Sequence, residues 1–276
     1  GFSLREFLLA NPAADRQVVL GADANGRPVY LTDRDRSMHV QVLGQTGSGK
    51  TKSVIEPLMF QDLWRGRGVL VVDGKASEEN HQRLAAMAAA AGRLGEVRIF
   101  SPSPYVASHT YNPLHLTANA DPQAVAERVF SSFVDDMDNP YYRDQARQLF
   151  CALVRALAAT GKPMIMRDVA ACIASREVLA HALSLSSDAK ARREIEAQLH
   201  ELGPKAGQTF TGLLAAVKRY DFPALSAYDP DIVLEDQVDR GGVVGFFLPA
   251  NYYKQLARNV GVVVFQHLQQ LGALRQ

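Results

Sequence analysis

The sequence predicts a parallel α/β fold that is interrupted by an all-α region. First, short β-branched runs alternate with helical patterns in the front part of the chain, from residue 38 to residue 120. Second, a glycine-rich phosphate-loop pattern at 44–51 lies between such a run and a helix. Third, residues 121–232 show helical patterns with no strand between them. Alternating strands and helices are typical of parallel sheets, which favours an α/β core carrying a helical insertion.

The N-terminal part predicts a β-hairpin followed by a buried strand. Residues 17–21 and 27–31 are strand-like and flank a polar turn in which Asn25 and Gly26 form a strong hairpin signal. The apolar run 39–43 then predicts the strand that leads into the phosphate loop.

Further elements follow in the expected alternating order. A helix is predicted over about 50–65, with a bend where Pro57 removes a donor. The continuous run 68–73 predicts a central strand buried on both faces. An alanine-rich helix over 77–92 and a short strand over 97–100 come next.

The remaining residues divide into a helical region and a return to the core. Helical patterns cover 121–135, 143–159, 166–184, 188–202 and 207–220, after which 242–248 predicts a strand and 251–275 a long helix. We therefore expect four segments: 1–37 with the hairpin, 38–120 as the first part of the nucleotide-binding core, 121–232 as the all-α insertion, and 233–276 as the core continued.

Composition limits the classes of function. The chain has 276 residues, 47% of them hydrophobic, with a net charge of +1, whereas proteins that wrap duplex DNA on their surface are usually more basic. A nucleic-acid partner would therefore need locally gathered positive charge. Cys151 and Cys172 lie in apolar helical patterns and predict two reduced core thiols. Without a membrane-spanning run or signal peptide, we expect a soluble, cytoplasmic chain.

The strongest functional signal is a complete phosphate-loop pattern. It consists of Gly44, Gln45, Thr46, Gly47, Ser48, Gly49, Lys50 and Thr51. Glycines let backbone N–H groups point at phosphate oxygens, and the following helix presents its positive dipole end. Lys50 is predicted to reach the β- and γ-phosphates of ATP, and the Thr51 hydroxyl to bind Mg²⁺.

Asp73 is a second candidate for the nucleotide site. A carboxylate at the end of an apolar strand can orient a Mg²⁺-bound water, which assigns Asp73 a supporting catalytic and metal-binding role. The alternative is that Asp73 caps or pairs near Lys75.

These motifs together resemble the motor domain of type IV coupling proteins, which are related to the FtsK/HerA-like translocases. The resemblance is carried by HVQVLGQTGSGKT, VIEP, VVDGK, GR followed by RIFSPSP, YNPL, YYRDQARQLF and GGVVGFFLPANYY, in that order along nearly the whole chain. It implies an ATPase with a RecA-like core, a largely parallel sheet and an inserted all-α domain.

The resemblance also implies partners and a place in the cell. Family members form hexameric rings that bring DNA, usually single-stranded and bound in a relaxosome, or secreted proteins to a type IV secretion channel. They hydrolyse ATP between subunits, with an arginine from the neighbour. The parent protein is then expected at the inner membrane, facing the cytoplasm.

Two departures from the family pattern shape the expectations for this chain. The N-terminal transmembrane helices of the family are missing, and no strand ending in Asp-Glu follows residue 248. We therefore expect the front part of a longer motor domain that binds ATP but hydrolyses it slowly.

Three alternatives stay open at this point. One is an FtsK/HerA-like DNA translocase, and another is a nucleotide-binding adaptor that recruits protein partners without turnover. A P-loop kinase with the helical region as its lid is the third, and the alternation of arginines with glutamates in that region disfavours it.

Overall fold

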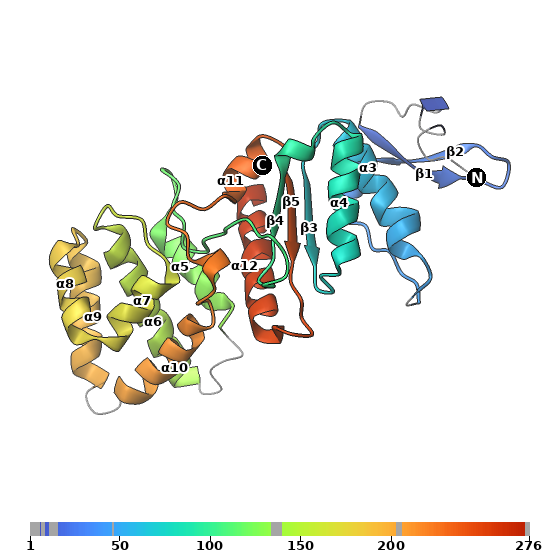
Figure 1. Ribbon diagram of the computed structural model, residues 1–276. Coiled ribbons are helices and arrows are strands. Elements are labelled where there is room, and N and C mark those ends of the chain that lie inside the picture. The colour runs from blue at the N-terminus through green and yellow to red at the C-terminus, as the bar shows by residue number, and fades with distance from the viewer. Residues whose placement is uncertain are drawn as a thin grey trace. The chain divides into compact units, whose positions relative to one another are not determined.

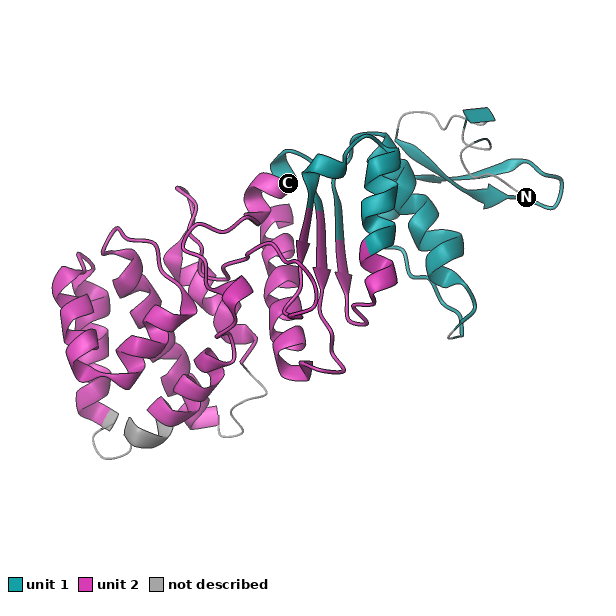
Figure 2. Ribbon diagram, in the orientation of Figure 1, with its two compact units in different colours: residues 1–70, 82–97, 238–243 teal, residues 71–81, 98–237, 244–276 magenta. Residues whose placement is uncertain are grey.

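The computed structural model describes residues 16–45, 47–133, 140–202 and 206–273, together with positions 6, 9 and 10. Figure 1 labels its strands and most of its helices. The chain divides into two compact units (Figure 2). Unit 1 contains residues 1–70, 82–97 and 238–243, and unit 2 contains residues 71–81, 98–237 and 244–276.

Strands and helices follow each other in the α/β order that the sequence predicts. The strands are β1 Gln17–Ala22, β2 Pro28–Thr32, β3 Val69–Asp73, β4 Val97–Phe100 and β5 Val243–Phe247. The helices are α2 Asp33–Ser37, α3 Glu56–Trp64, α4 Glu78–Ala90, α5 Pro122–Ser131, α6 Pro140–Ala158, α7 Met166–Ala174, α8 Arg176–Leu185, α9 Ala189–Leu202, α10 Ala206–Lys218, α11 Leu234–Asp239 and α12 Lys254–Ala273.

The main sheet has three strands in the order β3-β5-β4. The Val69 N–H donates to the Gly242 carbonyl at 3.0 Å, and the Leu248 N–H donates to the Asp73 carbonyl at 2.8 Å. Since both partners advance in the same direction, β3 and β5 are parallel, as predicted.

The prediction that residues 68–73 form a central, fully buried strand is wrong for the described sheet. There β5 is central and buried throughout, whereas Val72 of the edge strand β3 is 46% exposed.

A strand at 39–43, predicted to lead into the phosphate loop, is absent from the described structure. These residues have no regular secondary structure, and Val40 and Leu43 are 49% and 80% exposed. A parallel strand is held by hydrogen bonds to neighbouring strands, and an apolar run cannot supply these by itself. The sequence pattern was therefore insufficient to specify this strand.

The N-terminal hairpin is confirmed and is anchored on α3. β1 and β2 pair antiparallel, and the turn between them is closed by Asp23, whose carboxylate accepts the backbone N–H groups of Asn25 and Arg27 at 2.8 Å each. The buried Gln61 side chain of α3 accepts from the Val19 N–H at 2.7 Å and donates to the Val19 carbonyl at 2.9 Å. This amide satisfies backbone groups of β1 that water does not reach.

The predicted helix 50–65 is present, but its first part is a π-helix and only the rest is an α-helix. It begins with a π-helical turn at Thr51–Ile55, and α3 continues to Trp64. Pro57 lies in the first turn of α3 and has no N–H to donate backwards, so one regular helical hydrogen bond is missing there. Local widening of a helix beside such a gap is a common response.

Arg93 connects three segments of unit 1. Its side chain is buried and donates to the Arg67 carbonyl at 2.6 Å, to the Gly241 carbonyl and to the Glu96 carboxylate at 2.6 Å. The loops after α3 and before β5 therefore share one guanidinium, whose fixed fork of five donors suits several acceptors.

The helical region of unit 2 follows the predicted pattern, with one split. The predicted helix 166–184 is two helices, α7 and α8, because Ser175 adopts an extended conformation. Its hydroxyl accepts from the Val178 N–H at 3.3 Å and so caps α8. Positions 134 and 135, predicted to end the first helix, lie outside the described residues. The short helix α11 was not predicted.

Both cysteines are buried, free thiols, as predicted. Burial raises the pKa of the Cys151 thiol to about 12 and that of Cys172 to about 11. Thiols with such pKa values carry almost no thiolate near neutral pH, which is consistent with packing roles.

The chain enters and leaves the α6–α10 segment at neighbouring points. Ser132, just after α5, shares a 2.7 Å hydrogen bond with the buried hydroxyl of Tyr220, just after α10. Phe133 packs edge-on against the Tyr220 ring, with the ring centroids 5.8 Å apart. α5 itself is joined to α12, since Arg128 donates to Gln270 at 2.8 Å.

We expect Arg93→Met to destabilise the protein by about 3 kcal/mol, because it removes charge-assisted hydrogen bonds and leaves partly buried carbonyls without this donor. Urea unfolding followed by circular dichroism measures the change. Arg27→Met, at an exposed turn position, is the matched control and should stay within about 0.5 kcal/mol of wild type. Equal stability of both variants would contradict the role assigned to Arg93.

We propose that residues 121–232 form a separable all-α domain. Because α5 is joined to α12 by the Arg128–Gln270 hydrogen bond, two deletions, one that keeps α5 and one that removes it, test this proposal. Replacing residues 134–219 by a short Gly/Ser linker should leave a protein that melts cooperatively, because the two ends already lie side by side. Removing 121–232 also removes α5 from α12 and should lower the melting temperature further. Calorimetry compares the two deletions, and non-cooperative melting of both would mean that the domain proposal is wrong.

Candidate nucleotide-binding site

The predicted phosphate loop is a turn between an irregular segment and a helix. Gly44, Gln45 and 47–51 are described, whereas Thr46 lies outside the described residues. Gly47 and Gly49 have φ angles of +82° and +81°, a region that side chains disfavour. Two left-handed glycines within three positions curl the backbone, which is how successive N–H groups come to line one concave side of a loop.

Gly44 lies close to two side chains of its own loop. A Cβ at this position would lie 2.7 Å from the Ser48 hydroxyl oxygen and 3.2 Å from the side chain of Lys50. The Ser48 N–H in turn donates to the Gln45 carbonyl at 3.1 Å. The loop is therefore tightly closed on itself, and a larger residue at position 44 would require the Ser48 and Lys50 side chains to shift.

Lys50 lies across the loop that precedes it. Its Nζ donates to the carbonyls of Gly44 at 2.6 Å and Gln45 at 2.7 Å. An ammonium has three donors, so one further donor can serve an additional acceptor. The Lys50 side chain is thus held by its own loop, and its ammonium lies beside the backbone of Gly44 and Gln45.

Thr51 is exposed at the start of the helical segment that follows. Lys50, at the cap position, makes no side-chain cap, so the first N–H groups of this segment are not covered by a capping side chain. The Ser53 N–H already donates to the Gly49 carbonyl at 2.8 Å. The positive end of the helix dipole favours an anion at this point. Glycine backbone, lysine charge and helix start therefore all suit a phosphate group.

Ion pairs fix the helices on both sides of the loop. Arg36 of α2 pairs with Asp62 of α3, and Arg67 pairs with Asp33 at 2.7 Å. The hydrogen bond from Arg67 holds the pKa of Asp33 below its ordinary value. The segment 38–50 therefore starts and ends on helices that are tied together in unit 1.

Glu56, in the VIEP sequence after the loop, is also held in place. Its carboxylate accepts from Arg83 of α4 at 2.7 Å. Sequence reasoning missed Arg83, since the two residues belong to different elements and no spacing rule joins them.

Asp73 ends β3 and lies in unit 2, whereas the loop lies in unit 1. One carboxylate oxygen accepts the Lys75 backbone N–H at 3.0 Å, and the other accepts the side-chain amide of Asn80 at 2.7 Å. The capping interaction near Lys75, weighed as the alternative for this aspartate, is therefore present. A carboxylate oxygen has more than one lone pair, so these bonds leave acceptor capacity for a further group.

Asn80 and His81 are neighbours of Asp73 that sequence reasoning missed. His81 is buried against the Phe247 ring at a centroid distance of 4.0 Å, and burial lowers its pKa. The SEEN sequence at 77–80 offered a helix-start signal but no sign that the amide would turn back to the strand end. Among the residues with a described placement, no group of three or more His, Cys, Asp or Glu side chains could hold a metal by itself.

The parallel α/β topology and the glycine-lysine loop together define the P-loop NTPase fold. Residues 11–218, more than half of the chain, match the family model described as type IV secretory system conjugative DNA transfer. The chain belongs to this family, as its motifs predicted.

Individual relatives agree with this assignment. The type 4 coupling protein DotL of Legionella pneumophila (strain Philadelphia 1) is 25% identical over 158 residues, which cover 54% of this chain and 19% of DotL. The solved structure of the bacterial conjugative coupling protein TrwBdeltaN70 has a TM-score of 0.60 and 18% identity, covering 97% of this chain and 59% of that one. This likeness confirms the RecA-like fold. The matched part of this chain thus spans about a fifth of the length of DotL and about three fifths of the TrwBdeltaN70 chain.

In the part of the chain that the structure covers, none of the helices combines the length and apolarity that crossing a membrane requires.

Proposed function

We propose that this chain is the ATP-binding part of a coupling-protein motor. The observation that carries the proposal is the loop at 44–51 with Lys50 held across it, within a chain whose family is type IV conjugative DNA transfer. The name of DotL as a coupling protein and that of TrwBdeltaN70 as a conjugative coupling protein support the same role.

ATP fits the chemistry of the loop. Backbone N–H groups of the 47–51 turn would bind the phosphate oxygens, the Ser48 N–H by exchanging its bond to the Gln45 carbonyl. Lys50 would exchange its contacts with the Gly44 and Gln45 carbonyls for the β- and γ-phosphates. Its ammonium is already within reach of the loop, so little side-chain rearrangement is needed.

Mg²⁺ would be held by the Thr51 hydroxyl and by Asp73. The metal supplies positive charge that screens the phosphates during hydrolysis. Asn80 and the Lys75 N–H hold the Asp73 carboxylate in one orientation, which favours a supporting role for Asp73 in catalysis.

The finer features of the motor follow from the family. We propose that the full-length protein assembles as a hexameric ring at the inner membrane, facing the cytoplasm, with ATP hydrolysed between subunits. Its substrates would be DNA, mainly single-stranded and delivered in a relaxosome, or secreted proteins that pass to a type IV secretion channel. The net charge of +1 is compatible with DNA contacts concentrated in a ring interior rather than spread over the surface.

Lys50→Ala should weaken ATP binding by about tenfold to a hundredfold, because a charge-assisted hydrogen bond to phosphate is lost. The melting temperature should not fall, since the bonds of Lys50 are to an exposed loop. Titration with a fluorescent ATP analogue measures the affinity. The matched control is Lys52→Ala, which removes a lysine two positions further along the chain. Unchanged affinity in the Lys50 variant would remove this residue from the site.

Magnesium dependence tests Thr51 and Asp73. Thr51→Ala and Asp73→Asn should each raise the Mg²⁺ concentration needed for half-maximal nucleotide binding, by about tenfold for Asp73 because a charged ligand is lost. Asn80→Ala should have a smaller effect in the same direction, since it frees the carboxylate without removing it. If Asp73→Asn lowers only the melting temperature, Asp73 is a capping residue and not a metal ligand.

A further inference from the structure

Two tyrosines of unit 2 are almost completely exposed. Tyr105 is 95% exposed and Tyr252 is 86% exposed. In the described part of the chain, neither ring packs on another aromatic ring and neither hydroxyl forms a hydrogen bond. Tyr253 differs from its neighbour, since its ring packs edge-on against Phe222 at a centroid distance of 5.5 Å. A single exposed ring is ordinary, so the placement of the two rings decides whether they form a site.

The two tyrosines follow adjacent parallel strands. Arg93, just before β4, donates to the carbonyl of Gly241, just before β5. Phe100 at the end of β4 packs on Phe246 near the end of β5, with the ring centroids 5.5 Å apart. Since starts lie by starts and ends by ends, β4 and β5 are parallel neighbours. The loops that follow them therefore leave the same edge of the sheet (Figure 2).

The loop after β4 is closed at its base. The Ser101 N–H donates to the Ser108 hydroxyl at 2.9 Å, and the His109 N–H donates back to the Ile99 carbonyl at 2.7 Å. The chain between these bonds extends beyond the strand end, with Tyr105 in its middle. The exposure of this ring thus follows from a fixed loop base.

The loop after β5 is also held by backbone bonds. The Ala250 N–H donates to the Gly74 carbonyl at 3.2 Å, and the Tyr252 N–H donates to the Pro249 carbonyl at 3.0 Å. Tyr105 and Tyr252 each lie five residues beyond the end of their strand. Five residues span at most about 17 Å and neighbouring strands lie about 5 Å apart, so the two positions are within about 40 Å. One extended ligand can therefore contact both rings.

The segments that carry these tyrosines have no acidic residue. Residues 97–120 and 240–276 contain none of the chain's 29 Asp and Glu residues. They include Lys254 and Arg258, which are both exposed and lie one helical turn apart at the start of α12. Carboxylates repel a phosphate backbone, so segments without them favour contact with a polyanion.

Neighbouring segments do supply carboxylates, namely Asp73, Glu78, Glu79, Asp221 and Asp231. Asp73, Asp221 and Asp231 accept hydrogen bonds from protein side chains. Glu78 and Glu79, at the start of α4, offset the exposed Lys75. The edge therefore has little net charge beyond the two basic residues of α12, and a ligand must gain most of its affinity from the ring faces.

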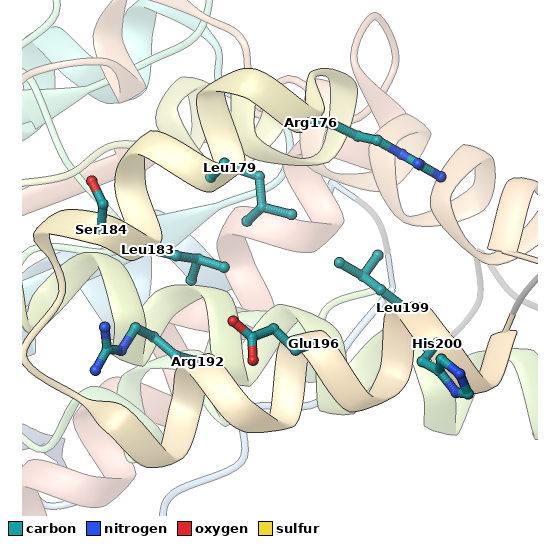
Figure 3. Close-up of a pocket in the computed structure, with 9 residues that line it drawn as sticks. Arg176, Leu179, Leu183, Ser184, Arg192, Glu196, Leu199 and His200 are labelled. Atoms are coloured by element: carbon teal, nitrogen blue, oxygen red, sulfur yellow. The ribbon is translucent and has the colours of Figure 1, made fainter.

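The helical region offers a different kind of surface. Figure 3 shows Arg192 and Glu196 on α9 at a pocket that leucines also line. Acidic and basic side chains alternate along this helix, and Leu179 and Leu183 are already buried. Mixed charge and buried apolar side chains leave little to hold a polyanion or its bases. The sheet edge is therefore the better candidate.

We propose that Tyr105 and Tyr252 form a stacking site for the unpaired bases of single-stranded DNA. Each ring would cover the face of one base, and the phosphates would pass Lys254 and Arg258. Every base has such a face, so stacking tolerates any DNA sequence, which suits a transfer motor. The inference rests on DNA being a substrate of the proposed motor. It uses residues of unit 2 alone and does not require bound nucleotide.

Two oligonucleotide probes and the whole chain test the proposal. The first is a fluorescein-labelled single strand of about fifteen deoxythymidines, within the site sizes of known single-strand binders. The second has the same phosphates and sugars but no bases. Fluorescence anisotropy should show about tenfold tighter binding of the base-containing probe to the wild-type chain, because only its bases can stack. A duplex of the same length should also bind more weakly than the single strand, since its bases are already stacked.

Tyrosine variants locate the site. Tyr105→Ala and Tyr252→Ala should each weaken the base-containing probe by about tenfold and leave the abasic probe within about twofold of wild type. Tyr105→Trp and Tyr252→Trp retain a stacking ring and should bind at least as well as wild type. Tyr228→Ala removes an exposed tyrosine of the helical region and is the matched control, expected to change neither affinity. Because both rings are exposed, the melting temperature should stay constant.

The outcomes separate this proposal from nucleotide binding. Lys50→Ala should bind the DNA probe as the wild type does, so a failure at the phosphate loop leaves this site untouched. Equal wild-type affinity for the base-containing and abasic probes would overturn the proposal, as would a DNA affinity that neither alanine variant changes. Loss of ATP-analogue binding in Tyr252→Ala, with DNA binding intact, would assign that ring to the adenine of ATP and would also overturn it.

Discussion

The parallel pairing of β3 with β5 is the constraint on which the rest of the fold depends. It joins Val69 to Gly242 and Asp73 to Leu248, residues from distant parts of the sequence. A parallel pair needs a crossover between its strands, and here the crossover contains α4, β4 and all the helices from α5 to α11. Because β5 is buried throughout, the loss of its register would expose the apolar centre of the sheet. The helical region therefore exists as an excursion between two paired strands.

Local hydrogen bonds orient two charged groups that the sequence singled out, one in each unit. Gly44 and Gln45 hold the ammonium of Lys50 through their carbonyls, and Asn80 holds the carboxylate of Asp73. In both cases a charged group is kept in one orientation by neighbouring polar atoms rather than by packing. Restricting the orientation of a charged group before a ligand arrives lowers the entropy cost of binding that ligand.

An ion pair joins two helices of unit 2. Between α6 and α9, Arg155 and Glu194 neutralise each other at a contact the protein makes with itself. The Arg155 side chain is 18% exposed, so the pair is only partly screened by solvent and helps to hold α9 on α6.

The sequence by itself determined the elements and the chemistry of the loop. Apolar periodicity predicted β3, β5 and most helices, and the glycines with Lys50 predicted a phosphate site, because these signals act over a few neighbouring residues. Only the tertiary structure decided that β3 lies at the edge of the described sheet, that residues 39–43 are not a strand there, and that Asn80 reaches Asp73. Strand order and side-chain partners depend on contacts between distant segments, and periodicity within one segment carries no information about its neighbours.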